Sequence, residues 1–236
     1  QYDSLTSEER WGDKFDVIMA NPPFMTPKGG IQPHKKFSLN SSRSEVLFVD
    51  YIISHMKPRG RAAVVVYEPV LFQNSSAHVE LRRKMVQEGL VGVVSLPRGV
   101  FEPYSGVKTS ILFFDKELAQ SKTSILFSKV NNDGFELTAL RKPIEANDLP
   151  QVAKEVKNWM KNEGSSAELS VEITREQVLL DEDISLIAER FFAPDVLTGE
   201  GAISIGDLLV PVSRTPRVGK EDLPILSITM ARGLVD

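Results

Sequence analysis

The fold is decided by residues 15–24, which read FDVIMANPPF. Residues 17–20 have the length and the β-branched content of a buried strand. The strand ends at Asn21-Pro22-Pro23-Phe24, because proline lacks an N–H and disfavours a helical backbone in the residue before it. We therefore expect an amide, carbonyl oxygens and an aromatic ring at the carboxyl end of a strand, where open α/β sheets bind ligands.

These groups suit the transfer of a methyl group to the amino group of a base. An exocyclic amine is a poor nucleophile, since its lone pair is delocalised into the ring, and two acceptors aimed at its N–H groups favour the form that attacks. Asn21 Oδ1 and the Pro22 carbonyl are the candidate acceptors, Phe24 is the candidate stacking ring, and Pro23 keeps the turn rigid. The base must first leave the duplex, and catalysis would consist of orientation and acceptor placement. Alternatively, Asn21-Pro22 only initiates a turn.

The tetrapeptide at 21–24 resembles the catalytic motif of amino-group methyltransferases that use S-adenosylmethionine (AdoMet). Residues 16–116 resemble the modification subunit of type I restriction–modification systems, which are adenine-N6 DNA methyltransferases. The segments that carry this resemblance are 16–24, 57–65, 95–101 and 109–114. It implies AdoMet as the cofactor, double-stranded DNA as the substrate, and specificity and restriction subunits as partners.

Two residues are candidates for cofactor binding. In the family, an acidic or amide residue upstream of the catalytic strand often contacts the AdoMet adenine, and Asp3 has that place; alternatively, Asp3 is a solvated surface acid. Asn21 is the second candidate. The Gly-rich loop that normally holds the methionine part of AdoMet is missing, because Gly29-Gly30 follows the catalytic strand instead of preceding it.

We therefore expect a fragment, which begins at Gln1 and approaches its catalytic strand within a few residues. On this view the chain alone binds AdoMet weakly or not at all. The strand at 17–20 should also leave an unpaired sheet edge, which favours aggregation or pairing with another chain.

The composition is that of an ordinary globular protein, with 42% hydrophobic and 25% charged residues. A net charge of −4 argues against nucleic-acid binding by bulk charge, although a local basic patch is compatible with it. No cysteine, membrane span or signal peptide is apparent, so we expect a cytoplasmic protein without disulfides. The three histidines lack metal-ligand spacing, so no metal site is expected.

A candidate DNA-binding loop follows the catalytic motif. Residues 25–43 contain no acidic residue and show no helical or strand period. Loops of this length inside a domain are usually functional or disordered. Its basic residues are suited to binding the phosphates that flank an extruded base, and the alternative is a solvated loop. They are Lys28, Lys35, Lys36 and Arg43.

Strands alternate with helices along the first part of the chain. A capping box at Ser42 and Glu45 predicts a helix to about residue 56. Strands are predicted at 62–67 and 90–96, with a helix at 78–88 between them whose residues 82–84 should lie on a solvated face. Strands at 110–114 and 124–130 are predicted to pair as an antiparallel hairpin at the sheet edge.

The predicted fold class is α/β. It is the C-terminal half of a Rossmann-like AdoMet-dependent methyltransferase sheet with a terminal antiparallel hairpin, plus a small α+β C-terminal appendage. Residues 1–145 are the catalytic half, 146–184 a helical connector with helices at 148–162 and 174–180, and 185–236 a further region. The last region resembles the start of a target-recognition region of a specificity subunit, and the alternative is a structural appendage.

Three functional hypotheses remain open on the sequence. The first is a fragment of an adenine-N6 DNA methyltransferase of a restriction–modification system. The second is methylation of RNA or of a protein glutamine, although family members acting on glutamine more often have Tyr where this chain has Phe24. The third is a non-catalytic DNA-binding or assembly subunit, which the intact tetrapeptide disfavours.

Overall fold

The computed structural model describes residues 3–7, 9–163, 167–192, 227–229 and 233–235. The chain divides into two compact units, Gln1–Ala193 and Pro194–Asp236. Of the second unit, the structure describes the antiparallel pair β9 (Ser227–Thr229) and β10 (Gly233–Val235). No helix in these described ranges has the length and apolar character needed to cross a membrane.

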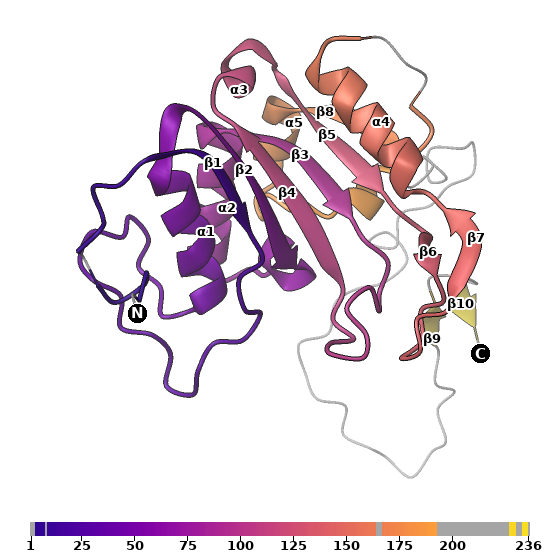
Figure 1. Ribbon diagram of the computed structural model, residues 1–236, viewed down its shortest axis with the longest axis horizontal. Coiled ribbons are helices and arrows are strands. Elements are labelled where there is room, and N and C mark those ends of the chain that lie inside the picture. Colours follow the sequence, from indigo (N-terminus) through magenta and orange to yellow (C-terminus); the bar gives the residue numbers. More distant parts are fainter. Residues whose placement is uncertain (1–2, 8, 164–166, 193–226, 230–232, 236) are drawn as a thin grey trace, which may run out of the picture. The chain divides into compact units, whose positions relative to one another are not determined.

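The first unit is built on a mixed sheet of six strands in the order β1-β2-β4-β3-β5-β8 (Figure 1). Strands β1, β2, β3 and β5 run in one direction, and β4 and β8 run in the other. The mixed α/β class predicted from the sequence is thereby confirmed. The strands are β1 (Phe15–Ala20), β2 (Met56–Tyr67), β3 (Leu90–Ser95), β4 (Thr109–Asp115), β5 (Ser124–Lys129) and β8 (Ser170–Thr174).

One face of the sheet carries the main hydrophobic core (Figure 1). Alternate strand residues such as Val64, Leu112 and Phe127 are fully buried there, as the period of two along a strand requires. The elements packed on this face are α1 (Ser44–His55), α2 (Ser76–Glu88), α5 (Arg175–Leu180) and the 3-10 turns η1 (Glu68–Leu71) and η2 (Ala188–Phe191).

On the opposite face α4 (Leu149–Met160) packs over β3 and β5, and residues Leu118 and Ala119 pack beside it. Its buried residues are Val152, Glu155 and Trp159, and Val156 and Met160 pack partly buried beside them. The short helix α3 (Leu118–Ser121) connects β4 to β5, and β6 (Asp133–Phe135) pairs separately with β7 (Pro143–Asn147).

The predicted pairing of residues 110–114 with 124–130 is wrong. Strand β3 lies between β4 and β5, pairing antiparallel with β4 and parallel with β5. The chain leaves β3 and returns antiparallel beside it as β4, so β4 occupies the place between β2 and β3. Antiparallel pairs outside the six-stranded sheet do exist in the described part, namely β6–β7 and β9–β10.

Helix ends agree with the sequence in two places and differ in one. Gly89, with φ of 138°, ends α2 after Glu88, and α5 begins where the sequence predicts a helix at 174–180, with a capping box formed by Thr174 and Gln177. The box predicted at Ser42 and Glu45 is wrong, because the N-cap of α1 is Arg43 and no side chain caps it. The carboxylate of Glu45 instead bonds to groups outside the helix.

The solvated face predicted for residues 82–84 is also wrong, except at the exposed Arg83. Arg82 is completely buried and donates to the carbonyls of Val70, Gln73, Asp183 and Ile184. Burial lowers the pKa of Arg82 to about 10. The buried guanidinium thereby joins α2 to the segment that enters η2.

Residues 185–192 belong with the sheet. Leu186 and Ala188 are buried in the main core, and the Leu186 N–H donates to the Leu71 carbonyl at 2.9 Å. The chain therefore divides after Ala193, whereas the sequence suggested a change at Ser185. Residues 203–209, on which the predicted recognition region largely rests, lie outside the described residues.

Strand β1 forms one edge of the sheet, and in the described part of the chain it pairs only with β2. The unpaired edge predicted for residues 17–20 is thus confirmed. Its outward side chains Phe15, Val17 and Met19 are 40%, 57% and 84% exposed. Ile18 and Ala20, which alternate with them, pack against the main core.

Candidate active site

The tetrapeptide at 21–24 lies directly after β1, at the edge of the sheet where β2, β3 and β5 also end. We call this end of the sheet the catalytic edge after its predicted role, which stays a prediction; the tetrapeptide lies where the sequence places it. Asn21 is exposed, and its side-chain amide makes no hydrogen bond to any described residue. Phe24 is half-buried, so its ring is partly fixed by neighbours while the amide stays free to meet a ligand.

Two aromatic rings surround Phe24. The centroid of Tyr67, the last residue of β2, lies 6.4 Å away, and that of Phe101 lies 5.9 Å away in an edge-to-face arrangement. A cavity of about 10 Å³, the size of a single water molecule, lies beside Phe24 and Tyr67. Its lining residues are Pro22, Pro23, Phe24, Glu45, Val65, Val66, Tyr67 and Val70.

Sequence reasoning missed Tyr67 and Phe101 as parts of this site. Phe101 is half-buried, and its ring meets that of Phe24. Tyr67 ends β2 and Phe101 follows β3, and although Phe101 lies in a segment that carries the family resemblance, that segment assigns it no role. The signal available was positional, because an aromatic residue at the carboxyl end of a parallel strand reaches the catalytic edge.

Hydrogen bonds hold the two residues after the tetrapeptide, Met25 and Thr26, against the first turn of α1. The Thr26 hydroxyl accepts from the Ser44 N–H at 3.0 Å and donates to Glu45 Oε2 at 2.5 Å. The Ser44 hydroxyl donates to the Met25 carbonyl at 3.0 Å. Tyr67 completes the network by donating to Glu45 Oε1 at 3.1 Å.

The charges in this network are stable near neutral pH. Burial raises the pKa of Glu45, but hydrogen bonds from Thr26, the backbone and Tyr67 outweigh it and hold the pKa below its usual value. Burial, together with the Glu45 charge, raises the pKa of Tyr67 to about 12. Glu45 is therefore an ionised acceptor and Tyr67 a neutral donor.

A second charged cluster ties the loop at 96–108 to the same edge. Lys108 bonds to Glu68 at 2.8 Å and also to Glu189, which accepts from the Ser95 hydroxyl at 2.6 Å. Burial lowers the pKa of Lys108, but its bonds to Glu189 and Glu68 prevail, so the net shift is upward. Lys108 therefore stays charged and anchors the end of the loop that carries Phe101.

A family model described as N-6 DNA Methylase matches residues 1–195. The chain belongs to the N-6 DNA methylase family. It is 38% identical over 108 residues to the type I restriction enzyme EcoEI methylase subunit of Escherichia coli, covering 45% of this chain and 22% of that subunit. It is 36% identical over 104 residues to the EcoKI methylase subunit of Escherichia coli K12, covering 44% and 19%. The chain thus spans about a fifth of the length of these curated relatives.

Solved structures agree with this family. A structure of a type I R-M system, determined to explain its assembly and conformational transition, matches with a TM-score of 0.59 and 26% identity, covering 83% of this chain and 41% of that one. The EcoKI M protein matches with a TM-score of 0.58 and 19% identity, covering 78% and 45%, which supports the fold.

The predicted DNA-contacting residues of this N-6 DNA methylase chain all lie exposed on one loop. The loop is not loosely attached, since Ile31 N–H donates to the Ser42 carbonyl at 2.8 Å and His34 N–H to the Leu5 carbonyl at 3.3 Å. Residues 31–42 line a polar cavity of about 670 Å³. The structure brings together Lys28, Lys35, Lys36 and Arg43 on this loop; their contact with DNA stays a prediction.

The predicted cofactor residues are less well supported by the geometry. The carboxylate of Asp3 accepts from the N–H groups of Leu5 at 2.9 Å and Thr6 at 3.4 Å, and the bond from Leu5 is the main reason that its pKa is lowered. Asp3 therefore stabilises its own turn. Of the two candidates, only Asn21 presents an unengaged polar side chain at the catalytic edge, so the described residues alone do not form a complete AdoMet cradle.

The three histidines serve packing. The rings of His34 and His55 lie 4.4 and 4.9 Å from Trp11, and His78 Nδ1 bonds to the Ser75 hydroxyl at 2.7 Å. In the described ranges, no three His, Asp or Glu residues are grouped as a metal site would require.

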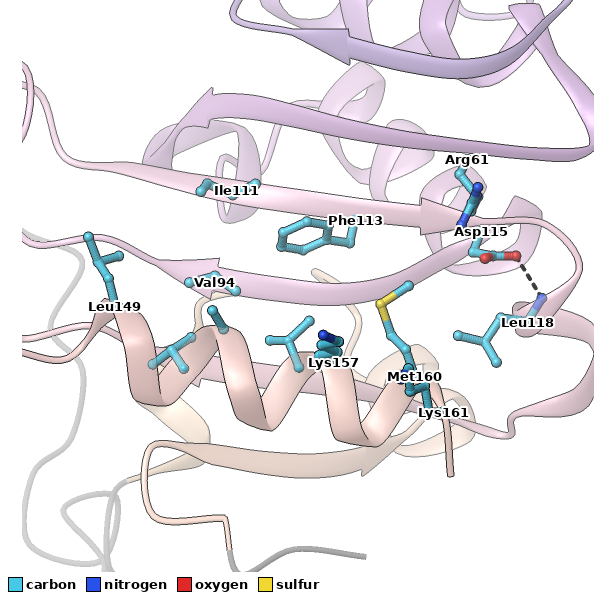
Figure 2. A pocket seen from close by; sticks show the side chains of 13 residues that line it. Arg61, Val94, Ile111, Phe113, Asp115, Leu118, Leu149, Lys157, Met160 and Lys161 are labelled. Carbon is cyan, nitrogen blue, oxygen red and sulfur yellow. Dashed lines mark hydrogen bonds between the residues drawn. The ribbon is translucent and has the colours of Figure 1, made fainter. Parts of the chain in front are cut away.

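A separate apolar cavity of about 530 Å³ lies between α4 and strands β3 and β4, on the face away from the main core (Figure 2). Ile111 and Phe113 of β4 and Leu149 and Met160 of α4 line it, and Arg61 stands at one end. None of the predicted site residues lines this cavity, so it is distinct from the candidate active site.

Proposed function

We propose that this chain is the catalytic part of an AdoMet-dependent adenine-N6 DNA methyltransferase of a type I restriction–modification system. The observation that carries the proposal is the position of Asn21. Its exposed amide, which makes no hydrogen bond to a described residue, follows the carboxyl end of β1 and stands three residues before Phe24, whose ring contacts Phe101. Family membership and the type I methylase subunits among its relatives support the same reaction.

In the proposed mechanism the target adenine leaves the duplex and enters at the catalytic edge. Asn21 Oδ1 and the Pro22 carbonyl accept hydrogen bonds from its N6 amino group, which localises the nitrogen lone pair for attack. Phe24 stacks on the base, Phe101 supports the Phe24 ring from its edge, and Pro23 limits movement of the turn. AdoMet, when bound, supplies the methyl group, and Asp3 and Asn21 are the residues of this chain proposed to contact it.

No side chain of the described network is suited to act as a general base. Glu45 already accepts from Thr26 and Tyr67 and lies 7% exposed, and Tyr67 keeps its proton. The rate enhancement would therefore come from placement of the amine and from acceptors fixed in advance. The proton released from N6 would pass to solvent.

DNA and other subunits are the proposed partners. The exposed basic residues of the loop at 25–43 would bind phosphates next to the extruded base. Specificity and restriction subunits are proposed because the relatives are methylase subunits of type I restriction enzymes.

The test uses the native enzyme, purified with its associated subunits. With labelled AdoMet, the label should appear in DNA, at N6 of adenine, and Asn21→Ala should abolish its transfer while leaving the melting temperature unchanged. Asn131→Ala, at another exposed asparagine, is the matched control and should retain full activity. Label in RNA or protein would show that the substrate is not DNA. Near-normal turnover of Asn21→Ala would show that Asn21 takes no part in the mechanism.

A further inference from the structure

Tyr104 is 95% exposed, and no large apolar or aromatic side chain in the described part of the chain is more exposed. It stands on the loop at 96–108, which leaves β3 and enters β4 at the catalytic edge. An aromatic side chain in this position buries almost none of the surface that normally makes it stabilising. Its exposure therefore needs an explanation outside the folding of the chain.

The loop holds Tyr104 in a defined place. The Tyr104 N–H donates to the Phe101 carbonyl at 2.9 Å, the Ser105 N–H donates to the same carbonyl at 3.0 Å, and Phe101 and Ser105 form a β-bridge. The Glu102 N–H donates to the Gly99 carbonyl at 3.1 Å. Together with the Lys108 anchor, these bonds make a compact turn that presents the ring to solvent.

The turn has an inward and an outward aromatic ring. Phe101 points inward and meets Phe24 edge to face at 5.9 Å, and Tyr104, three positions later, points outward. The Glu102 carboxylate lies against Gly106 on the same turn. Arg98, on the same loop, is exposed.

We propose that Tyr104 inserts into the DNA stack beside the target adenine and fills part of the gap that the extruded base leaves. The inference rests on the proposed function, because it needs a duplex from which a base is withdrawn. Aromatic and apolar wedges open base steps in this way in other DNA-binding proteins, and stacking on a base is tolerant of sequence. Tyr104 is three residues from Phe101, whose ring contacts Phe24. The same turn would therefore hold the duplex open and help to enclose the extruded base.

The experiment compares two DNA substrates that differ in the cost of extrusion. In one, the target adenine is paired, and in the other it lies opposite an abasic site, which makes extrusion easier. On the paired substrate, Tyr104→Ala in the native enzyme should lower kcat/KM by about ten-fold, the scale of one lost base–aromatic stack. On the abasic substrate its activity should return to within about three-fold of the unsubstituted enzyme. Tyr104→Trp should keep activity on both.

One control variant and the outcomes below decide whether Tyr104 acts as a wedge. Leu180→Ala, which removes another exposed apolar side chain from α5, should behave as the unsubstituted enzyme on both substrates. Equal loss by Tyr104→Ala on both substrates, no loss on either, or loss of associated subunits in gel filtration would each overturn the wedge. An unsubstituted enzyme that labels no DNA would instead contradict the proposed function itself.

Discussion

Glu45 is the residue that joins the catalytic tetrapeptide to the body of the protein. It is buried, and it accepts from Thr26 just beyond Phe24 and from Tyr67 beside the Phe24 ring. In Glu45→Gln the amide nitrogen cannot accept the Thr26 hydroxyl, so the tetrapeptide loses part of its support. A buried group left without its partner costs about 1–3 kcal/mol.

We therefore expect Glu45→Gln to lower kcat of methyl transfer about ten-fold, by misplacing the acceptors, with a smaller change in KM. Tyr67→Phe, which removes one of the donors, should have the weaker effect. Steady-state kinetics and a melting curve of each variant measure this. A variant that melts earlier but keeps its kcat would show that Glu45 contributes only to folding.

Buried histidines predict a pH dependence of stability. Burial is the main cause that lowers the pKa of His55 and of His78 below the usual 6.5. The unfolded chain thus binds more protons than the folded chain at mildly acidic pH, so the free energy of unfolding should rise with pH and level off above about 6.5. Melting temperatures between pH 5 and 7.5 would show it. The slope should flatten in His55→Phe and His78→Gln, and a slope of opposite sign would contradict the assignment.

At the residue scale, the sequence was most informative where chemistry is local. Proline fixes its own backbone and that of its neighbour, so the position of Asn21 could be predicted without the rest of the fold. Phe101 could not be assigned in the same way, because its contact with Phe24 depends on two strands meeting at one edge. Arg82 was misplaced, because a charged residue gives no sign in the sequence that distant carbonyls will surround it.

The loop at 25–43 is an element whose charge can be tested as a unit. Lys35 and Lys36 are exposed on it. Replacing both with Ala should weaken binding to all DNA sequences alike and flatten the dependence of binding on salt, since fewer counterions are released. The slope of log K against log salt for the native enzyme measures this.

The matched control for that loop is a pair of exposed lysines on α4. Replacing Lys154 and Lys157 with Ala removes the same charge from another part of the surface and should leave the slope unchanged. If both double variants shift the slope equally, general charge and not the loop is responsible.

At the element scale, most strands and helices could be predicted from periodicity, because each buries one face. Pairing could not, and β4 with β5 is the instructive case. Both segments have the pattern of strands, and a short polar connection separates them, which is also what a hairpin requires. The contact that decides the matter is β3 pairing with both, and no local pattern contains it.

For the whole molecule, the exposed edge predicts self-association of the chain when it is studied alone. Val17 and Met19 are exposed on β1, an edge strand in the described part of the sheet. Unpaired backbone groups beside exposed apolar side chains favour strand pairing between molecules. Met19→Lys should therefore lower light scattering of the isolated chain, and Leu180→Lys, on α5, should not. Equal scattering by both would place the association elsewhere.

The reversed direction of β4 has a consequence for how such an enzyme can vary. Strand β3 runs toward the catalytic edge and β4 runs away from it. Both ends of the turn bearing Tyr104 are therefore continuous with paired strands of the sheet. Residues could be added to or removed from the middle of this turn without changing the pairing register of either strand. The length of this turn can thus change independently of the tetrapeptide at 21–24, and under the proposed function related enzymes would differ in how far the turn reaches into a duplex.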